Sequence, residues 1–401
     1  MWKKWRLFHA IDFQSLMYPC FIFCNILGIF PYKINGTTFE TSKQHYILST
    51  VIICVFCIYE LVVLYEIDVT QTVKYKGVPK TLERNCFYIL GSFIAIVTHI
   101  LSGPRMHLLQ AIMKISWRVP FNSYRKLSRL IHAKDILGFF FLVAGGVLYY
   151  TTLDFDTWHK ALVPYIHLLV FQMDMLYMNC VCVLKACFKG INNDLKNLRE
   201  LLINDKPYLP RRIYHEHSNL FLLVELKALK KQHIVVSDIV QMLNMIFSLQ
   251  LIASIILTFA EITFNLYFYI MHWKTGILMS NMSDQLYNTF LIGIMVYYSI
   301  KMVLIGWACE TGKDEAVKIG RTIHEVLNST RDEQIKVELQ LFSLQILQYE
   351  NVFSAKGLIV DANLLTAIVG NITTYVLILI QFVIASQLCN GQIATNTTQI
   401  Y

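Results

Sequence analysis

Seven apolar segments, each long enough to cross a lipid bilayer, constrain this chain more than any other feature of its sequence. A transmembrane helix needs about 20 mostly apolar residues, and the candidates are 46–66, 86–103, 135–153, 163–184, 240–268, 286–308 and 364–388. The second segment ends at the helix-breaking pair Gly103-Pro104. The alternating pattern of a membrane β-barrel does not recur along the chain. The sequence therefore predicts an all-α, seven-transmembrane-helix membrane protein.

Composition excludes most other classes of protein. Hydrophobic residues make up 55% of the 401 residues and charged residues 15%, whereas about a quarter of a soluble domain is charged. The net charge of +8 suits cytosolic loops rich in Lys and Arg, so we expect no nucleic acid as a partner. No Gly-rich phosphate loop, nucleophile elbow or paired nucleophile and base occurs. His215-Glu216-His217 lacks the spacing that places two ligands on one helical face. We expect no enzymatic activity, no cofactor and no metal site.

Charge and acceptor sequences indicate the orientation. Lys and Arg concentrate before the first span and in 104–134, 185–239 and 309–363, and such residues favour the cytosol. Asn281 and Asn396 begin N-glycosylation acceptor sequences that would then lie outside. We therefore expect the N-terminus to be cytosolic and the C-terminus to be extracellular.

The same reading divides the chain into regions. Ser15–Phe30 is apolar but broken by Pro19, which favours a short re-entrant or interfacial helix over a cleaved signal peptide. The expected regions are a cytosolic N-terminal segment (1–45), a six-helix ligand-binding region (46–308) with cytosolic helical extensions at about 104–134 and 185–239, cytosolic anchor helices (309–363), a pore-lining seventh helix (364–388) and an extracellular tail (389–401).

The anchor region contains an apolar stripe that predicts a helix over 333–355. Its members recur at steps of three and four: Leu339, Phe342, Ile346, Tyr349 and Phe353. Such a stripe packs either against another helix of the same chain or against a second subunit.

Ionisable residues inside the spans are the main candidates for chemistry. Asp174 lies near the middle of the fourth span and Glu261 in the outer part of the fifth, where a charge costs about 3 kcal/mol or more. Each is expected to face protein or water, with His167 and Asn265 nearby on the same helices. A polar ligand cavity and a purely structural bond both remain open. Glu60, near the outer end of the first span, is expected to reach the membrane interface.

Tyrosines mark the outer ends of several spans. They are Tyr149 and Tyr150 in the third, Tyr165 in the fourth and Tyr287 in the sixth. They indicate either an interfacial aromatic belt or the wall of a mostly apolar ligand pocket.

The last span carries a motif. It reads Thr374-Tyr375, five apolar residues, then Gln381-Phe382, and near the N-terminus Leu27-Gly28-Ile29-Phe30-Pro31 adds a second segment. Both resemble the insect gustatory receptor family, within the insect chemoreceptor superfamily. The resemblance implies a tetrameric, ligand-gated, non-selective cation channel in the plasma membrane of chemosensory neurons. Tyr375, Ile378, Gln381 and Phe382 would form its pore and gate.

The resemblance also implies partners. These are a small-molecule tastant bound in a pocket open to the outside, permeating cations, membrane lipids, and either identical subunits in a homotetramer or related gustatory receptor subunits. The ligand class stays open between sugars, bitter compounds, amino acids and others. The alternatives are a seven-helix receptor of the G-protein-coupled type and a small-molecule transporter. The first would carry Asn-Pro-x-x-Tyr, where Asn371-Ile-Thr-Thr-Tyr375 lacks the proline, and the second tends to show inverted repeats.

Overall fold

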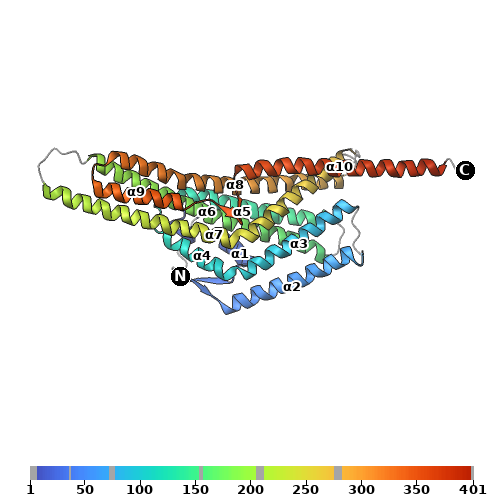
Figure 1. Cartoon of the computed structure of the whole chain (residues 1–401). Helices are drawn as coiled ribbons and strands as arrows, with labels where there is room; N and C mark the ends of the chain where they lie inside the picture. Colours follow the sequence, from blue (N-terminus) through green and yellow to red (C-terminus); the bar gives the residue numbers. More distant parts are fainter. Residues whose placement is uncertain are drawn as a thin grey trace.

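The computed structural model is an elongated bundle of helices (Figure 1) and describes residues 7–35, 38–71, 77–152, 157–204, 212–274 and 282–398. The elements, in chain order, are α1 (Phe13–Ile26), β1 (Tyr32–Asn35), β2 (Thr38–Thr41), α2 (Lys43–Asp68), α3 (Val78–Ile100), α4 (Ser102–Ser116), α5 (Phe121–Thr152), α6 (Thr157–Asn204), α7 (Arg212–Lys274), α8 (Met282–Ser329), α9 (Glu333–Gln348), β3 (Ser354–Ala355), β4 (Leu358–Ile359) and α10 (Ala362–Thr398). Each strand pair is a small antiparallel hairpin. The all-α class is therefore confirmed.

The apolar segments form long helices where they were expected. Among the described residues, α2, α5, α6, α7, α8 and α10 are each long and apolar enough to cross a membrane, and α3 passes the same test together with α4. Helices α6, α7 and α8 continue far beyond their apolar parts and form, with α9, an extension at one end of the bundle, while α10 reaches out at the other end (Figure 1).

The second span does not end at Gly103-Pro104. Helix α3 ends at Ile100, and α4 begins at Ser102 after a bend of 64°. Proline is tolerated in the first turn of a helix because the N–H groups there have no intrahelical acceptor. The pair therefore lies at the start of a new helix instead of terminating the old one.

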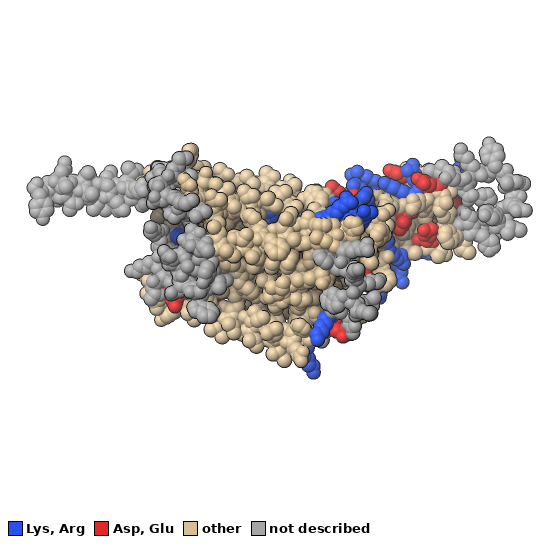
Figure 2. Space-filling view, turned by 180° about the vertical axis from the view of Figure 1, so that it is seen from behind, with Lys and Arg blue, Asp and Glu red and all other residues tan. Residues whose placement is uncertain are grey.

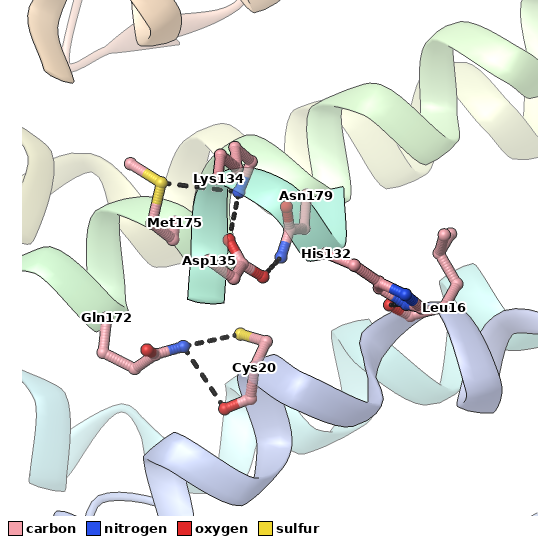
Figure 3. A network of polar contacts seen from close by, with 8 residues as sticks. All are labelled: Leu16, Cys20, His132, Lys134, Asp135, Gln172, Met175 and Asn179. Carbon is pink, nitrogen blue, oxygen red and sulfur yellow. Dashed lines mark hydrogen bonds and ion pairs between the residues drawn. The ribbon is translucent and has the colours of Figure 1, made fainter. Parts of the chain in front are cut away.

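Helix α1 is buried inside the bundle, where it packs against α5, α6 and α4. Its N-terminus carries a capping box, in which Asp12 accepts from Ser15 N at 2.8 Å. His132 of α5 accepts from Phe8 N at 3.1 Å through Nδ1, so Nε2 carries the proton and donates to the Leu16 carbonyl at 3.0 Å (Figure 3). Gly28, with φ of 70°, then turns the chain into β1. The membrane placement of α1 stays a prediction.

Gln172 of α6 holds the middle of α1. Its Nε2 donates to the Cys20 carbonyl at 3.2 Å and to Cys20 Sγ at 2.9 Å (Figure 3). Deeper in α5, Asp135 pairs with Lys134 and accepts from Asn179 Nδ2 at 2.8 Å. Helix α1 is therefore bonded to two of the long helices.

The predicted helix over 333–355 is shorter in the structure. Helix α9 ends at Gln348, where Tyr349 turns extended, and the chain forms no helix from Tyr349 to Phe353. Asn244 of α7 fixes this segment, since its Nδ2 donates to the Val352 carbonyl at 2.7 Å and its Oδ1 accepts from Ser354 N at 3.2 Å. Phe353 is buried, but against Gly312 of α8 and not on the stripe of α9. The continuous stripe through Phe353 was therefore wrong beyond Ile346.

Burial separates a central helix from a marginal one. In the most apolar window of α6, 89% of the residues are buried, whereas the figure for α10 is 11%. The space-filling view shows a broad surface almost free of charge, with Lys and Arg gathered toward the end that carries the long extension (Figure 2). This difference in burial makes α6 the helix around which polar contacts in the core can form. Helix α10 has few neighbours that cover it in the described structure.

Candidate functional site

A buried ion pair lies at the centre of the bundle. Asp174 of α6 and Lys301 of α8 are joined at 2.8 Å between Oδ2 and Nζ, and neither side chain is more than 1% exposed. Ser254 of α7 donates to the same carboxylate oxygen, and Lys301 donates to Ser254 Oγ at 3.2 Å. A lone charge at this depth would be costly, and the pair makes the site neutral overall. Three helices thus meet at one charge-neutral centre.

The polar contacts continue from this centre along α6 and α8. The Lys301 ammonium lies 5.1 Å from the ring centroid of Tyr298, one turn earlier in α8. The Tyr298 hydroxyl is 3.0 Å from His167 Nδ1. His167 lies two turns before Asp174 on α6. Asp174, Lys301, Ser254, Tyr298 and His167 form one connected group, which we call the polar column.

A second polar group surrounds Glu261 of α7. Asn265 Nδ2 donates to the Glu261 carbonyl at 2.6 Å and to its carboxylate at 3.2 Å. Lys80, Glu83 and Arg84 of α3 are close enough to act electrostatically on Glu261. Lys80 and Glu83 themselves form an ion pair. We call these five residues the outer cluster. Arg84 and Lys301 both act electrostatically on His167, so the outer cluster and the polar column are adjacent.

Aromatic rings border both groups. Phe87 of α3 lies 4.8 Å from the His167 ring, and Tyr297 lies 4.9 Å from Tyr298. Tyr149 is buried, with the Arg84 guanidinium 5.9 Å from its ring centroid. An apolar wall with a few converging polar groups is the usual character of a small-molecule site. Because these side chains fill the space between the helices, a ligand would have to replace some of their contacts.

Five of the eight predicted ligand residues belong to these two groups or to their border. Asp174 and His167 are in the column, Glu261 and Asn265 in the cluster, and Tyr149 beside it. Tyr165 is not with them: its hydroxyl donates to the Leu27 carbonyl at 3.1 Å and its ring packs on Phe56.

The remaining predicted residues are not described at the level of side chains. Tyr150 and Tyr287 lie in α5 and α8, and Asn396 in α10, but their side chains lie outside the described part of the structure. Asn281 lies outside the described residues altogether.

Glu60 does not reach the membrane interface. It is fully buried, and neither carboxylate oxygen has a hydrogen-bond partner among the described residues. The side chain faces the interior of the bundle because helix α2 turns the face with Phe56, Glu60 and Val63 inward. The expectation for Glu60 was therefore wrong.

The sequence also places Lys301 inside the sixth span, but the predicted ligand residues did not include it, nor Ser254, Tyr298 and the three charged residues of α3. Lys301 and Asp174 were available as opposite charges inside two spans, and that complementarity was the one usable signal. Ser254 and Tyr298 carry no comparable signal, because Ser and Tyr are common in transmembrane helices.

Helix α10 carries the four predicted pore residues on an uncovered surface. Ile372 and Val376 are its buried residues within the part whose side chains are described. Asn371, Thr374, Ile378 and Gln381 recur at steps of three and four, Phe382 lies four residues after Ile378, and all five are exposed. Tyr375 is exposed next to them and contacts Phe259 of α7 edge-on at 5.7 Å. One face of α10 therefore presents polar groups and Phe382 away from its own subunit.

Comparison with known proteins gives a family, a relative and two structures. The family model described as 7tm Chemosensory receptor matches residues 17–386. A putative gustatory receptor 28b of Drosophila melanogaster is 32% identical over 142 residues, which are 35% of this chain and 30% of that protein. The match thus spans about a third of that relative. The olfactory receptor OR5 of Machilis hrabei has the same fold, with a TM-score of 0.69 at 10% identity, covering 92% of this chain and 98% of that one. The structure of OR5 in complex with eugenol gives a TM-score of 0.67, also at 10% identity.

Proposed function

Because the chain belongs to the 7tm chemosensory receptor family, we propose that it is a gustatory receptor that works as a ligand-gated, non-selective cation channel. Four subunits, identical or related, place their α10 helices around one pore. A small-molecule tastant binds among the helices of each subunit and opens it. The receptor acts in the plasma membrane of chemosensory neurons, with a cytosolic N-terminus and an extracellular C-terminus.

The uncovered face of α10 is the observation that carries this proposal. Within the part of α10 whose side chains are described, a narrow stripe packs on α7 and α8. The opposite face places Asn371, Thr374 and Gln381 in line, and polar groups of this kind are unfavourable against lipid. A water-filled pore between subunits would hydrate these groups, whereas lipid would not.

Phe382 suits the role of a gate. In the single chain it is 67% exposed, which is high for a large apolar side chain. Four such rings at one level of a pore would form an apolar constriction that blocks ions by dewetting. Gln381, one residue earlier, would supply carbonyl and amide groups to a hydrated cation once the ring widens.

The outer surface of α9 supports assembly of several copies. Val337, Leu341, Leu344 and Leu347 are exposed and recur at steps of three and four. This helix lies in the extension, away from the surface that is free of charge (Figures 1 and 2). An exposed apolar stripe outside the membrane usually marks a protein interface, so the stripe fits the subunit anchor.

The polar column and the outer cluster are the proposed ligand site. They offer buried donors and acceptors beside aromatic rings, and helices α6, α7 and α8 all contribute. Tastant binding that rearranges these contacts would move α7 and α8, the two helices on which α10 packs. This gives a direct mechanical route from ligand to pore.

Two measurements test the proposal. Cells that express this chain alone are exposed to a ligand panel and read by calcium influx; an active ligand then allows the pore to be mapped. Ile378→Cys should render the current sensitive to a charged methanethiosulfonate reagent. Val369→Cys is the control, because Val369 is also exposed, 64% against 50%, but lies nine residues earlier and points about 180° away around the helix. Equal modification at both positions would contradict a pore face on α10.

A further inference from the structure

Helix α4 differs from the other long helices in its direction. It departs from α3 by 64° and continues toward the end of the bundle that carries the extension (Figure 1). One face, with Leu108, Leu109 and Ile112, is fully buried in the bundle. The opposite face is exposed and polar, with His107 and Lys114. Helix α4 is therefore amphipathic, and a basic polar face beside an apolar one suits the level of lipid headgroups.

A groove follows the exposed face of α4. It has a volume of about 300 Å³ and is lined by Gln110, Met113, Lys114 and Trp117, which are spaced three and four residues apart. Trp117 is 74% exposed at the C-terminal end of α4. An exposed tryptophan in a membrane protein is typical of the headgroup region, where its ring meets the acyl chains and its N–H meets polar groups.

The segment of chain that forms the groove carries charge of one sign. No Asp or Glu occurs between Glu83 and Asp135. The turn after α4 is tight, because the buried Tyr124 hydroxyl donates to the Ser116 carbonyl at 2.6 Å. This contact holds the first turns of α5, with exposed Arg125 and Lys126, next to the end of α4.

The cations of this surface lack acidic partners. Lys114, Arg125 and Lys126 form no ion pair among the described residues, in contrast to Lys313, Lys318 and Lys336 of the extension. Unpaired cations beside an exposed aromatic ring and an open groove are complementary to an anionic headgroup with an acyl chain attached.

We propose that the groove on α4, together with the basic start of α5, binds an anionic phospholipid of the inner leaflet. Lys114 and Gln110 contact the headgroup, Trp117 lies at the boundary with the acyl chains, and Arg125 and Lys126 attract the headgroup charge. This inference rests on the cytosolic placement of the α4–α5 turn in the proposed function.

The test uses the purified full-length receptor in detergent, titrated with phosphatidylserine or phosphatidylcholine that carries bromine on its acyl chains. Bromine quenches nearby indoles, and the difference between wild type and Trp117→Phe isolates the signal of Trp117. We expect phosphatidylserine to quench Trp117 at a concentration at least tenfold lower than phosphatidylcholine. The triple variant Lys114→Gln/Arg125→Gln/Lys126→Gln should lose this preference, since each cation near a membrane contributes about fivefold (about 1 kcal/mol).

A matched triple variant provides the control. Lys318→Gln/Arg321→Gln/Arg331→Gln removes the same charge from exposed positions on α8 and directly after it. Helix α4 packs chiefly on α6 and α7, so these positions are remote from the groove. This variant should keep the preference. Equal quenching by both lipids, no signal from Trp117, or equal losses in the two triple variants would each overturn the proposal.

A separate measurement distinguishes this proposal from the channel function. Lys114→Cys should react with a membrane-impermeant maleimide applied to the cytosolic side and not to the outside of intact cells. Labelling from outside would overturn the proposed orientation and the lipid site together. Agonist-evoked current is read independently, so its absence would refute the channel while leaving the lipid titration intact.

Discussion

Replacing Lys301 with methionine is expected to destabilise the receptor by about 3–5 kcal/mol, the usual result of breaking a buried ion pair from one side. Methionine keeps most of the length of the side chain and removes the ammonium. The Asp174 carboxylate is left fully buried. Its Oδ1 has no hydrogen-bond partner among the described residues, and its Oδ2 keeps the bond from Ser254.

The geometry sets the size of the effect. At 2.8 Å and an effective dielectric constant of about 20, two unit charges attract by about 332/(20 × 2.8), or about 6 kcal/mol. Desolvation of both ions opposes most of this attraction, so the net contribution of the pair is small. The loss in the single variant comes from the charge that stays buried without its partner. The double variant Asp174→Asn/Lys301→Met removes both charges and should recover at least half of the loss.

The assay combines surface labelling of intact cells with thermal unfolding of the purified receptor. Lys313→Met is the matched control on the same helix, because its ammonium is 4.0 Å from Glu310 at the surface and such pairs contribute about 0–1 kcal/mol. A Lys301→Met receptor as stable as Lys313→Met would refute the reasoning. So would a double variant that is less stable than both single variants, because the two effects would then be additive instead of coupled.

The double variant also tests the role of Asp174 in ligand recognition. Asp174→Asn alone leaves the Lys301 ammonium unpaired, so reduced surface expression would obscure any effect on binding. In the double variant, a ligand that uses this charge pair should lose at least tenfold in potency, or about 1.4 kcal/mol. Unchanged dose–response curves for every active ligand would limit the pair to a structural role.

Three further predictions concern the gate, the packing of α5 and the link to α10. Phe382→Ala should raise basal current without reordering agonist preference, and Leu377→Ala should do neither; the reverse pattern in patch-clamp recordings would place the gate elsewhere. Gly138→Ala should lower thermal stability by about 1–3 kcal/mol, because a Cβ there would lie 2.3 Å from the Phe171 ring, whereas at Gly145 it meets nothing within 4 Å and Ala should be neutral or stabilising. Asn244→Ala should cost about 1–3 kcal/mol through the unpaired Val352 carbonyl and Ser354 N–H; an unfolding midpoint equal to wild type would show that the hairpin before α10 is held by other contacts.

Hydropathy predicted the helices well because it is a local property of the chain. Each long apolar run had to become a helix, since a helix satisfies its own backbone hydrogen bonds in lipid. The motif in α10 added the pore residues by resemblance, and the exposure of Ile378 and Phe382 is consistent with that role. The pore function of these residues stays a prediction.

Helix ends and short elements were less predictable. The apolar character of Tyr349 and Phe353 suggested a longer α9, but bonds from Asn244 of α7 fix that segment in an extended form. The break at Gly103-Pro104 was visible, yet a proline can end one helix or start the next, and only the packing of α4 against α6 and α7 decided between them. Helix ends are hard to predict because the residue that bonds to the end of a helix can lie far away in the sequence.

The sequence by itself determined that this protein is a set of apolar helices with a few polar residues in the middle of the spans. Exposing backbone or charge to lipid is unfavourable for each segment separately, so this outcome depends on local sequence. Which polar residues meet was decided only by the tertiary structure. Asp174 finds Lys301, Glu60 finds no partner among the described residues, and Tyr165 bonds to the end of α1 instead of the polar column. These outcomes depend on the rotation and depth of each helix relative to its neighbours, which side-chain packing sets across the whole bundle.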